Sequence, residues 1–367
     1  GTERLFNKIG VLYFETGDYR KSIQYFRKAL SQVQNQLHPN PYFIVNYKNN
    51  IASALRKLQD NEEALKIYKS LLSYEINKNE LLHNIGATYL NEGKPKEAIT
   101  FLLKVQYNTR IKLNDIGHAY LLLGKTDSAH YFLQKAMVAL PLLKKEIKDL
   151  DYGITLRWLG DLSLKEGRFS EALSFFQQSI IQIDYDFNDT LVTHNPTSFQ
   201  GLHNSYLLFN VLAAKGFAFN QLFKSNHSYE MLKSALAAYL SSINLARHVE
   251  KTFNSDEARL FFSNQAVEAY RNAIDISLQL YEFSQERNYL DQAFSLMENS
   301  KASVLLAGIQ QLSLESIVGL PQDLIREERN YKMAITKLNL ELGNLTTQQE
   351  ISEAQKKLTD LEIKLSE

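Results

Sequence analysis

A single motif recurs along the first half of the chain and restricts what the chain can fold into. The motif starts with a Gly in an apolar segment. An aromatic residue follows three places later, a second Gly seven places later, and a small residue twelve places after the first Gly. The copies lie at Gly10, Tyr13, Gly17 and Ser22; at Gly86, Tyr89, Gly93 and Ala98; at Gly117, Tyr120, Gly124 and Ala129; and, without the aromatic residue, at Gly160, Gly167 and Ala172. A degenerate copy has Ala52 in place of the first Gly and keeps Ala64 and Tyr68. Such repetition predicts an array of similar structural units.

The spacing favours two antiparallel helices in each unit. A small residue in the first helix allows the second helix to approach closely. The second Gly ends the first helix in a backbone conformation that a Cβ atom disfavours. The small residue of the second helix belongs to the same crossing, and the aromatic residues fill the space between successive hairpins. Because one hairpin cannot bury its apolar face alone, the hairpins must stack.

These segments resemble tetratricopeptide repeats (TPRs). From Gly86 to Gly117 is 31 residues, close to the TPR length of about 34. The longer steps, 42 residues from Gly10 to Ala52 and 43 from Gly117 to Gly160, are similar to the longer repeats of kinesin light chains. The resemblance implies an all-α fold: a right-handed superhelical solenoid of antiparallel helix pairs, followed by a helical hairpin or coiled-coil extension.

The second half of the chain contains longer and less regular hairpins. One has Gly216 and Phe219 in its first helix and Ala235, Tyr239 and Ser242 in its second, with SNHSYEML predicted as a lengthened turn. A further hairpin is expected to have a first helix over residues 255–282, in which Ser255 is the N-cap. Its second helix contains YLDQAFSLMENSKASVLL.

This last segment resembles the helical region that directly precedes a CHAT domain, a caspase-like peptidase fold found with TPRs. The matching residues are Ala293, Phe294, Glu298, Ser300, Lys301, Ala302, Leu305 and Leu306. The resemblance covers residues 205–367 and implies a peptidase further along the same chain. The family's catalytic residues are a His and a Cys. Because this sequence has no Cys, no catalytic residue is predicted here, and either the peptidase is missing from the given sequence or the protein has lost it.

The last part of the chain carries a second apolar periodicity. Leucines and other apolar residues recur by three, four or seven between Leu324 and Leu345, and again between Ile351 and Leu365. This pattern predicts an antiparallel helical hairpin, with Thr347 and Glu350 as the capping box of its second helix. The predicted organisation is a TPR array over 1–200, longer TPR-like hairpins over 201–312, and a helical hairpin or coiled-coil linker over 313–367.

Composition narrows the classes of partner. The chain has 41 Lys and Arg and 41 Asp and Glu, so a nucleic-acid partner is not expected. It has no run of eighteen apolar residues, so membrane insertion is not expected. It opens inside an amphipathic helix without a signal-peptide pattern, which favours a cytoplasmic protein unless a signal has been removed. No cofactor or metal is predicted.

Several short patterns resemble ligand sites but favour simpler interpretations. Gly124-Lys125-Thr126 lacks the earlier Gly of a phosphate-binding loop and is interpreted as a turn. The segment DYDFND, residues 184–189, lacks the Gly and Glu of a calcium loop and is interpreted as a solvated loop. His83 and His118 are interpreted as ordinary polar residues, since a metal pair is the less favoured alternative. Trp158 is expected in the core, and the cluster of Lys144, Lys145 and Lys148 is expected to be a solvated face.

What remains is binding by the first helices, which line the concave side of stacked hairpins. In repeats of this kind, the side chains at the second, fifth and ninth motif positions point into the groove. The predicted partner-binding residues are Asn46, Asn49, Ser53, His83, Asn114, His118, Arg157, Asp161 and Asn210. They do not match the Lys–Asn and Lys–Arg pattern of the TPRs that bind acidic chain termini. The expected partner is a protein or a peptide of another kind.

Three functions remain open. The first is a sensor and scaffold arm that positions or regulates a downstream caspase-like peptidase. The second is a stand-alone adaptor without an enzyme. The third is the sensor arm of a signalling kinase or a DNA-binding regulator. Under the first, partner binding is expected to change the curvature of the array.

Overall fold

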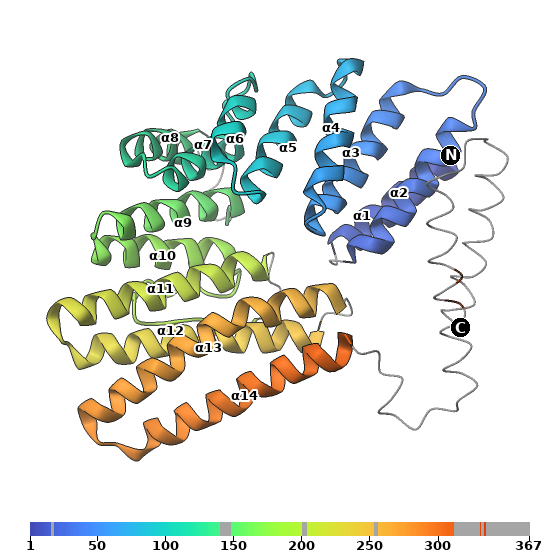
Figure 1. Cartoon of the computed structure of the whole chain (residues 1–367). Coiled ribbons are helices and arrows are strands. Elements are labelled where there is room, and N and C mark those ends of the chain that lie inside the picture. The colour runs from blue at the N-terminus through green and yellow to red at the C-terminus, as the bar shows by residue number, and fades with distance from the viewer. Residues whose placement is uncertain are drawn as a thin grey trace. The chain divides into compact units, whose positions relative to one another are not determined.

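The computed structural model describes residues 1–15, 18–139, 148–199, 204–252 and 256–311, together with Tyr331 and Ala334. In this part of the chain the regular secondary structure is helical (Figure 1). The helices are α1 (Thr2–Glu15), α2 (Tyr19–Gln34), α3 (Pro41–Lys57), α4 (Asn61–Leu71), the 3-10 turn η1 (Leu72–Tyr74), α5 (Lys78–Asn91), α6 (Pro95–Leu102), α7 (Arg110–Leu122), α8 (Thr126–Val138), α9 (Leu150–Lys165), α10 (Phe169–Ile183), α11 (Ser205–Asn226), α12 (Tyr229–Thr252), α13 (Asp256–Ser284) and α14 (Arg287–Gln311).

Consecutive helices pair as antiparallel hairpins, and the hairpins stack in chain order from α1–α2 to α13–α14 (Figure 1). The predicted all-α solenoid of antiparallel helix pairs is therefore confirmed. The chain divides into two compact units, Gly1–Val304 and Leu305–Glu367. The stacked hairpins belong to the first unit, which ends at Val304 within α14. The predicted hairpin over 324–365, including Thr347 and Glu350, lies outside the described residues.

The first Gly of each motif lies where the two helices of a hairpin cross. A Cβ atom on Gly86 would lie 2.6 Å from Cγ of Leu102, and one on Gly160 would lie 2.4 Å from Cε1 of Phe176. Both distances are shorter than van der Waals contact. The helices of these hairpins pack so closely that only Gly fits at the crossing, as the motif predicts.

The second Gly of the motif ends the first helix. Gly93, Gly124 and Gly167 have φ angles of +67°, +72° and +74°. These lie in the left-handed region, which Gly adopts at little cost. At the first of these turns, the amide of Lys94 donates to the carbonyl of Tyr89 at 2.8 Å, which closes the helix end. Gly17 lies outside the described residues.

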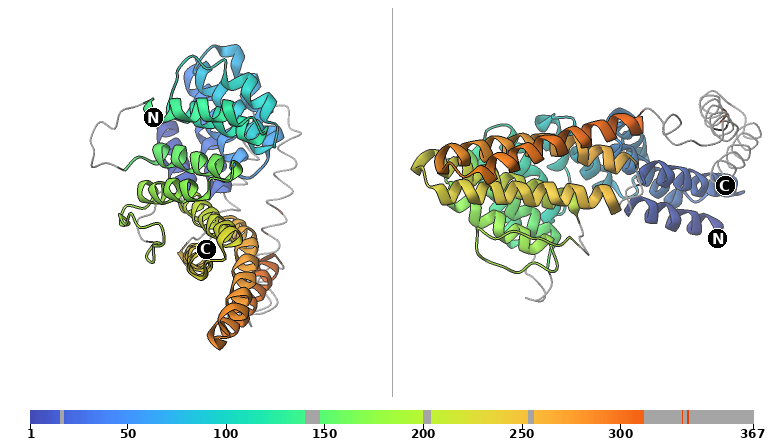
Figure 2. Two further views of the ribbon diagram at one scale, coloured as in Figure 1. Left: turned by 90° about the vertical axis from the view of Figure 1, so that its left-hand side faces the viewer. Right: turned by 90° about the horizontal axis from the view of Figure 1, so that it is seen from below.

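The later hairpins are built from longer helices, and α11–α14 lie side by side (Figure 2). Helices α11 to α14 have 22, 24, 29 and 25 residues. One continuous core runs from Ala172 in α10 to Leu296 in α14. The prediction of a lengthened turn at SNHSYEML is wrong, because α11 continues to Asn226 and α12 begins at Tyr229. The left-handed His227, with φ of +52°, reverses the chain instead. Ser255 lies outside the described residues.

No helix in the described part of the chain is long and apolar enough to cross a membrane.

Candidate binding surface on the first helices

The first helices of neighbouring hairpins contact one another. Helix α3 contacts α5, α5 contacts α7, and α7 contacts α9. Among the described residues, contacts between the second helices of neighbouring hairpins are fewer. The first helices therefore lie on the inner side of the stack, as stacked hairpins require for curvature.

Polar side chains join α3 to α5. Asn49 donates from Nδ2 to Oε1 of Glu80 at 2.8 Å and accepts at Oδ1 from Asn84 at 2.9 Å. Asn46 accepts at Oδ1 from Nδ2 of Asn77 at 2.7 Å. Two of the predicted partner-binding residues thus hold adjacent hairpins together, and Asn49 is buried in doing so.

Two other predicted residues form hydrogen bonds within their own hairpin or helix. The Ser53 hydroxyl lies 2.9 Å from the hydroxyl of Tyr68 in the second helix of the same hairpin. Asn210 donates to the carbonyl of Tyr206, one turn earlier in α11, at 2.9 Å. Both side chains are half-buried.

A His–Asp pair joins α5 to α7, and an amide side chain joins α7 to α9. His83 in α5 has Nε2 at 2.9 Å from Oδ2 of Asp115 in α7. Asn114 in α7 donates from Nδ2 to the carbonyl of Asp151 in α9 at 3.0 Å. Asn114 is 1% exposed, and its Oδ1 has no hydrogen-bond partner among the described residues. The junction of α7 and α9 therefore contains a buried hydrogen-bond acceptor without a donor in the described part of the chain.

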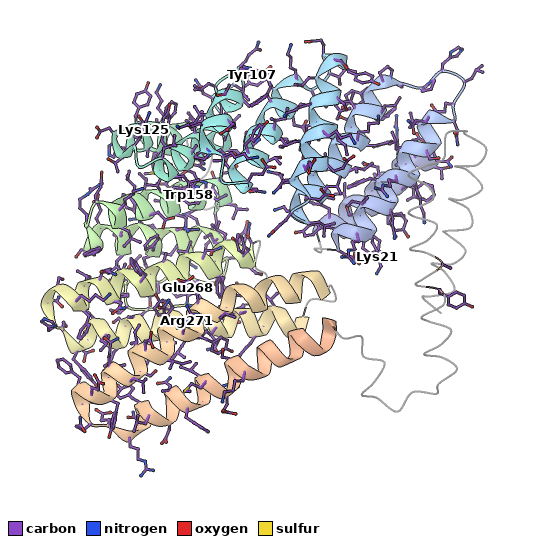
Figure 3. All side chains as sticks on the ribbon, in the orientation of Figure 1. Lys21, Tyr107, Lys125, Trp158, Glu268 and Arg271 are labelled. Atoms are coloured by element: carbon purple, nitrogen blue, oxygen red, sulfur yellow. The ribbon has the colours of Figure 1, made fainter. Side chains whose placement is uncertain are left out.

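Aromatic stacking adds to the junction of α7 and α9. His118 stacks on Trp158 with ring centroids 3.7 Å apart and an interplanar angle of 11°. Trp158 lies on α9, on the side that faces α7 (Figure 3). Burial lowers the pKa of His118 from 6.5 to about 4; Asp115 opposes this shift and Arg157 adds to it. Because of its burial, His118 is therefore neutral at pH 7.

Arg157 and Asp161, also predicted as partner-binding residues, form an ion pair one turn apart on α9. Nη2 of Arg157 lies 3.0 Å from Oδ2 of Asp161, and Nε donates to the same oxygen at 3.1 Å. The guanidinium carbon lies 4.8 Å from the ring centroid of Trp158. Burial raises the pKa of Asp161, against the effect of Arg157. The two side chains largely neutralise each other on this surface.

A pocket of about 540 Å³ lies beside the start of α5 and α7. It is lined by Glu75, Asn77, Lys78, Asn79, Glu80, His83, Val105, Tyr107, Thr109 and Ile111. Tyr107 and Ile111 are 64% and 45% exposed, although both are large and apolar. The motif missed them because Tyr107 lies in the connection before α7 and Ile111 is the second residue of that helix. Large apolar residues in a connection that leads into a first helix are the signal that sequence could have provided.

The other short patterns have structural roles. Gly124-Lys125-Thr126 forms the turn between α7 and α8, as expected. The Lys148 side chain is not on a solvated face, because its Nζ donates to the carbonyls of Asp184 and Phe187. The solvated interpretation is therefore wrong for Lys148. It is also wrong for Asp184, which is buried. Lys144 and Lys145 lie outside the described residues, and the described residues contain no group of His, Asp and Glu that could hold a metal ion.

A buried lysine that sequence analysis did not identify fixes the connection between α10 and α11. Lys215 in α11 is 0% exposed. Its Nζ donates to Oε1 of Gln177 at 2.5 Å, to the carbonyl of His194 at 2.7 Å and to Oδ1 of Asn195 at 2.8 Å. Burial lowers the pKa of Lys215 from 10.5 to about 7. Its bonds to His194 and Asn195 hold the segment 184–199 against α11, and its bond to Gln177 joins α11 to α10.

The sequence matches known repeat proteins in its first third. The tetratricopeptide repeat family is matched by residues 1–74 and again by residues 80–109. The anaphase-promoting complex subunit CDC16 of Saccharomyces cerevisiae is 32% identical over 101 residues. That match covers 28% of this chain but 12% of the yeast protein, so the chain spans a small part of this relative.

Solved TPR structures are similar over larger parts of the chain but at low identity. A thermophilic TPR protein of Thermus thermophilus is 20% identical with a TM-score of 0.40, covering 49% of this chain and 91% of that one. A tetratricopeptide repeat protein from Parabacteroides merdae is 12% identical with a TM-score of 0.44, covering 81% of this chain and 99% of that one.

The predicted TPRs are thereby confirmed, since the family matches fall on the hairpins α1–α4 and α5–α6. TPR proteins generally mediate protein–protein interaction, and their repeats present an extended concave surface.

Proposed function

We propose that this chain is a non-catalytic scaffold that binds a protein or peptide on the inner surface formed by α3, α5, α7 and α9. The observation that carries the proposal is the pocket at the start of α5 and α7, where Tyr107 and Ile111 are exposed beside Glu80 and His83. Exposed apolar side chains next to convergent polar groups are typical of a recognition site. Five of the predicted groove residues support this surface by fixing one first helix against the next: Asn46, Asn49, His83, Asn114 and His118.

Site-specific photo-crosslinking tests this proposal in the source organism. A photo-reactive amino acid replaces Tyr107 in one variant of the full-length protein. A second variant carries it at Tyr131, which is 53% exposed on the second helix α8 and serves as the matched control. We expect a discrete adduct from position 107 that position 131 does not give. Adducts of the same mass and amount from both positions, or from 131 alone, would refute the proposed surface.

We also propose that the array positions or restrains a caspase-like peptidase in the full-length protein. The segment that resembles the end of such arrays lies within α14, and its Ala293 and Leu296 are buried. The segment therefore completes the stack rather than standing apart from it. The coding sequence beyond Glu367 provides the test. A following domain with a catalytic His and Cys is expected; a stop codon would favour the stand-alone adaptor, and a kinase or a DNA-binding module would favour a signalling arm.

A further inference from the structure

Three successive first helices each place one carboxylate at their junctions. They are Glu80 in α5, Asp115 in α7 and Asp151 in α9, called here the acidic strip. Glu80 accepts from the neutral amide of Asn49, and Asp115 lies against His83. Among the described residues, no Lys or Arg forms an ion pair with any of the three.

The nearby basic residues are already engaged elsewhere. Lys78 pairs with Glu75 at 2.8 Å, Arg110 pairs with Asp149, and Arg157 pairs with Asp161. These three pairs largely cancel their own charge, and the acidic strip is offset by His83 beside Asp115 and by the field of Arg110 at Asp151.

Lys112 is also engaged elsewhere. It is buried and donates from Nζ to the carbonyl of Val105 at 2.6 Å. The carboxylates also act on one another. Burial raises the pKa of Asp151, as do Asp149 and Asp115, while Arg110 opposes the shift. The strip is therefore a region of negative potential.

Asn114 independently indicates that this strip lacks a donor. Its side chain lies between α7 and α9, where Nδ2 donates to the carbonyl of Asp151. Its Oδ1 is buried and has no partner among the described residues. Buried polar atoms are rarely left without a hydrogen bond. Within the part of the chain that the structure describes, Oδ1 of Asn114 is thus an acceptor without a donor beside Asp151, at one end of the strip.

The pocket provides an apolar wall at one end of the strip. Val105, Tyr107 and Ile111 line it together with Glu80, His83 and Lys78, and Lys78 is paired with Glu75. An occupant that places an apolar side chain against Tyr107 and Ile111 would bring its next side chain close to Glu80. A cation at that neighbouring position would gain from the field of the carboxylates.

We propose that the acidic strip and its pocket bind a peptide segment in which a Lys or Arg adjoins a large apolar residue. This inference rests on the proposed scaffold function and specifies its partner. Among the described residues, the three carboxylates form no ion pair with Lys or Arg, so a cation of the peptide can pair with them. An acidic peptide would meet repulsion along the whole strip.

A peptide array tests the proposal with the purified full chain. The probes are nine-residue peptides with a fixed Gly-Ser frame and every pair of residues at the two central positions. The test variant carries Glu80→Gln, Asp115→Asn and Asp151→Asn. The control variant carries Glu62→Gln, Glu97→Gln and Asp127→Asn, which neutralise three carboxylates in the first turns of α4, α6 and α8. Thermal melting establishes that both variants are folded.

We expect wild type and control to select Lys or Arg beside Leu, Ile, Phe or Tyr. The dissociation constant of the selected peptides should be about tenfold higher for the test variant, since three partly exposed ion pairs are lost. Binding by the wild type should also weaken as salt is raised. Selection without regard to charge, or equal affinity in test and control variants, would overturn this inference and leave the scaffold function standing. The absence of any bound peptide would count against both.

Discussion

At the scale of one residue, His118 shows how the stacking of hairpins changes the pKa of a side chain. A histidine in the motif is ordinarily a polar surface residue with a pKa near 6.5. Here the neighbouring first helix places Trp158 flat against the ring, and burial lowers the pKa to about 4. Between these two values the unfolded chain binds more protons than the folded one. The stability contributed by the neutral ring is thus full above pH 6.5 and is lost as the pH falls towards 4.

Replacing His118 should therefore make stability less sensitive to acid. We expect the free energy of unfolding of the wild type to fall by about 2 kcal/mol more than that of His118→Gln between pH 7 and pH 4.5. Urea unfolding at the two pH values measures the difference. His130→Gln, at an exposed position on α8, is the matched control and should behave like wild type. An acid sensitivity in His118→Gln equal to that of wild type would show that His118 is not the responsible group.

Lys215 is a second residue whose role depends on its buried surroundings and not on its residue type alone. Its substitution by Met would remove the donor from three oxygens, two of which belong to the segment 184–199. We expect Lys215→Met to be destabilised by about 2–4 kcal/mol and to be cut by protease within 184–199. Lys224→Met, at an exposed position on the same helix, should remain resistant. Resistance in both variants would mean that other contacts fix this segment.

The pH dependence of Lys215 has a defined sign. Its pKa is about 7 in the folded protein against an ordinary value of 10.5. Between pH 7 and 10.5 the unfolded chain binds the extra proton, so the contribution of this group to stability rises with pH. Lys215→Met should lack this rise in urea unfolding measured at pH 7 and 9. A rise of the same size in the variant would assign it to another group.

The sequence could place single residues on the inner helices but could not identify their partners. The motif positions correctly put Asn49, Asn114 and His118 on first helices. Their bonding partners come from helices 31 to 40 residues away in sequence, as in Asn49 with Glu80 and His118 with Trp158. Those pairings depend on how far one hairpin rotates against the next, which the motif does not specify. Because Asn114 is buried, removing its side chain would alter stability as well as binding.

At the scale of the hairpin, the sequence predicted the helix crossings best, because the close approach of two helices restricts the size of the residue between them. Gly in a helix is normally replaced by Ala with a gain of about 1 kcal/mol. At Gly160 that rule should fail, because an added Cβ would lie 2.4 Å from the buried ring of Phe176. The close crossing of the two helices therefore explains why the motif requires Gly here.

We expect Gly160→Ala to lower the free energy of unfolding by about 1–3 kcal/mol. The reciprocal change in the degenerate repeat, Ala52→Gly, should also be destabilising, by about 1 kcal/mol, because that hairpin already accommodates a methyl group. Thermal or urea unfolding of both variants provides the measurement. A more stable Gly160→Ala protein would show that the helices can move apart without cost.

Hairpin length was less predictable than hairpin pairing. The polar segment SNHSYEML reads as a loop, yet most of it extends α11 and α12. Packing of α11 and α12 over their full length along a continuous core outweighs the weak helix preference of Ser, Asn and His. The motif predicts that two helices pair, whereas tertiary packing determines where each helix ends.

At the scale of the stacked hairpins, the sequence predicted the repeat array and its inner surface but not the pocket. The pocket is made by the ends of two first helices and the connection between hairpins, where the motif has no fixed residue. The acidic strip is likewise visible only when α5, α7 and α9 are stacked. Each helix contributes a single carboxylate, which carries no signal by itself.

Hydrogen exchange can locate a bound partner on the first helices. The full chain is incubated with a peptide selected from a random twelve-residue library, and amide exchange is compared with and without it. We expect slower exchange in α5 and α7, extending to α9, with little change in α6, α8 and α10. Protection confined to the second helices, or to α13 and α14, would contradict it and move the binding site to another face of the array.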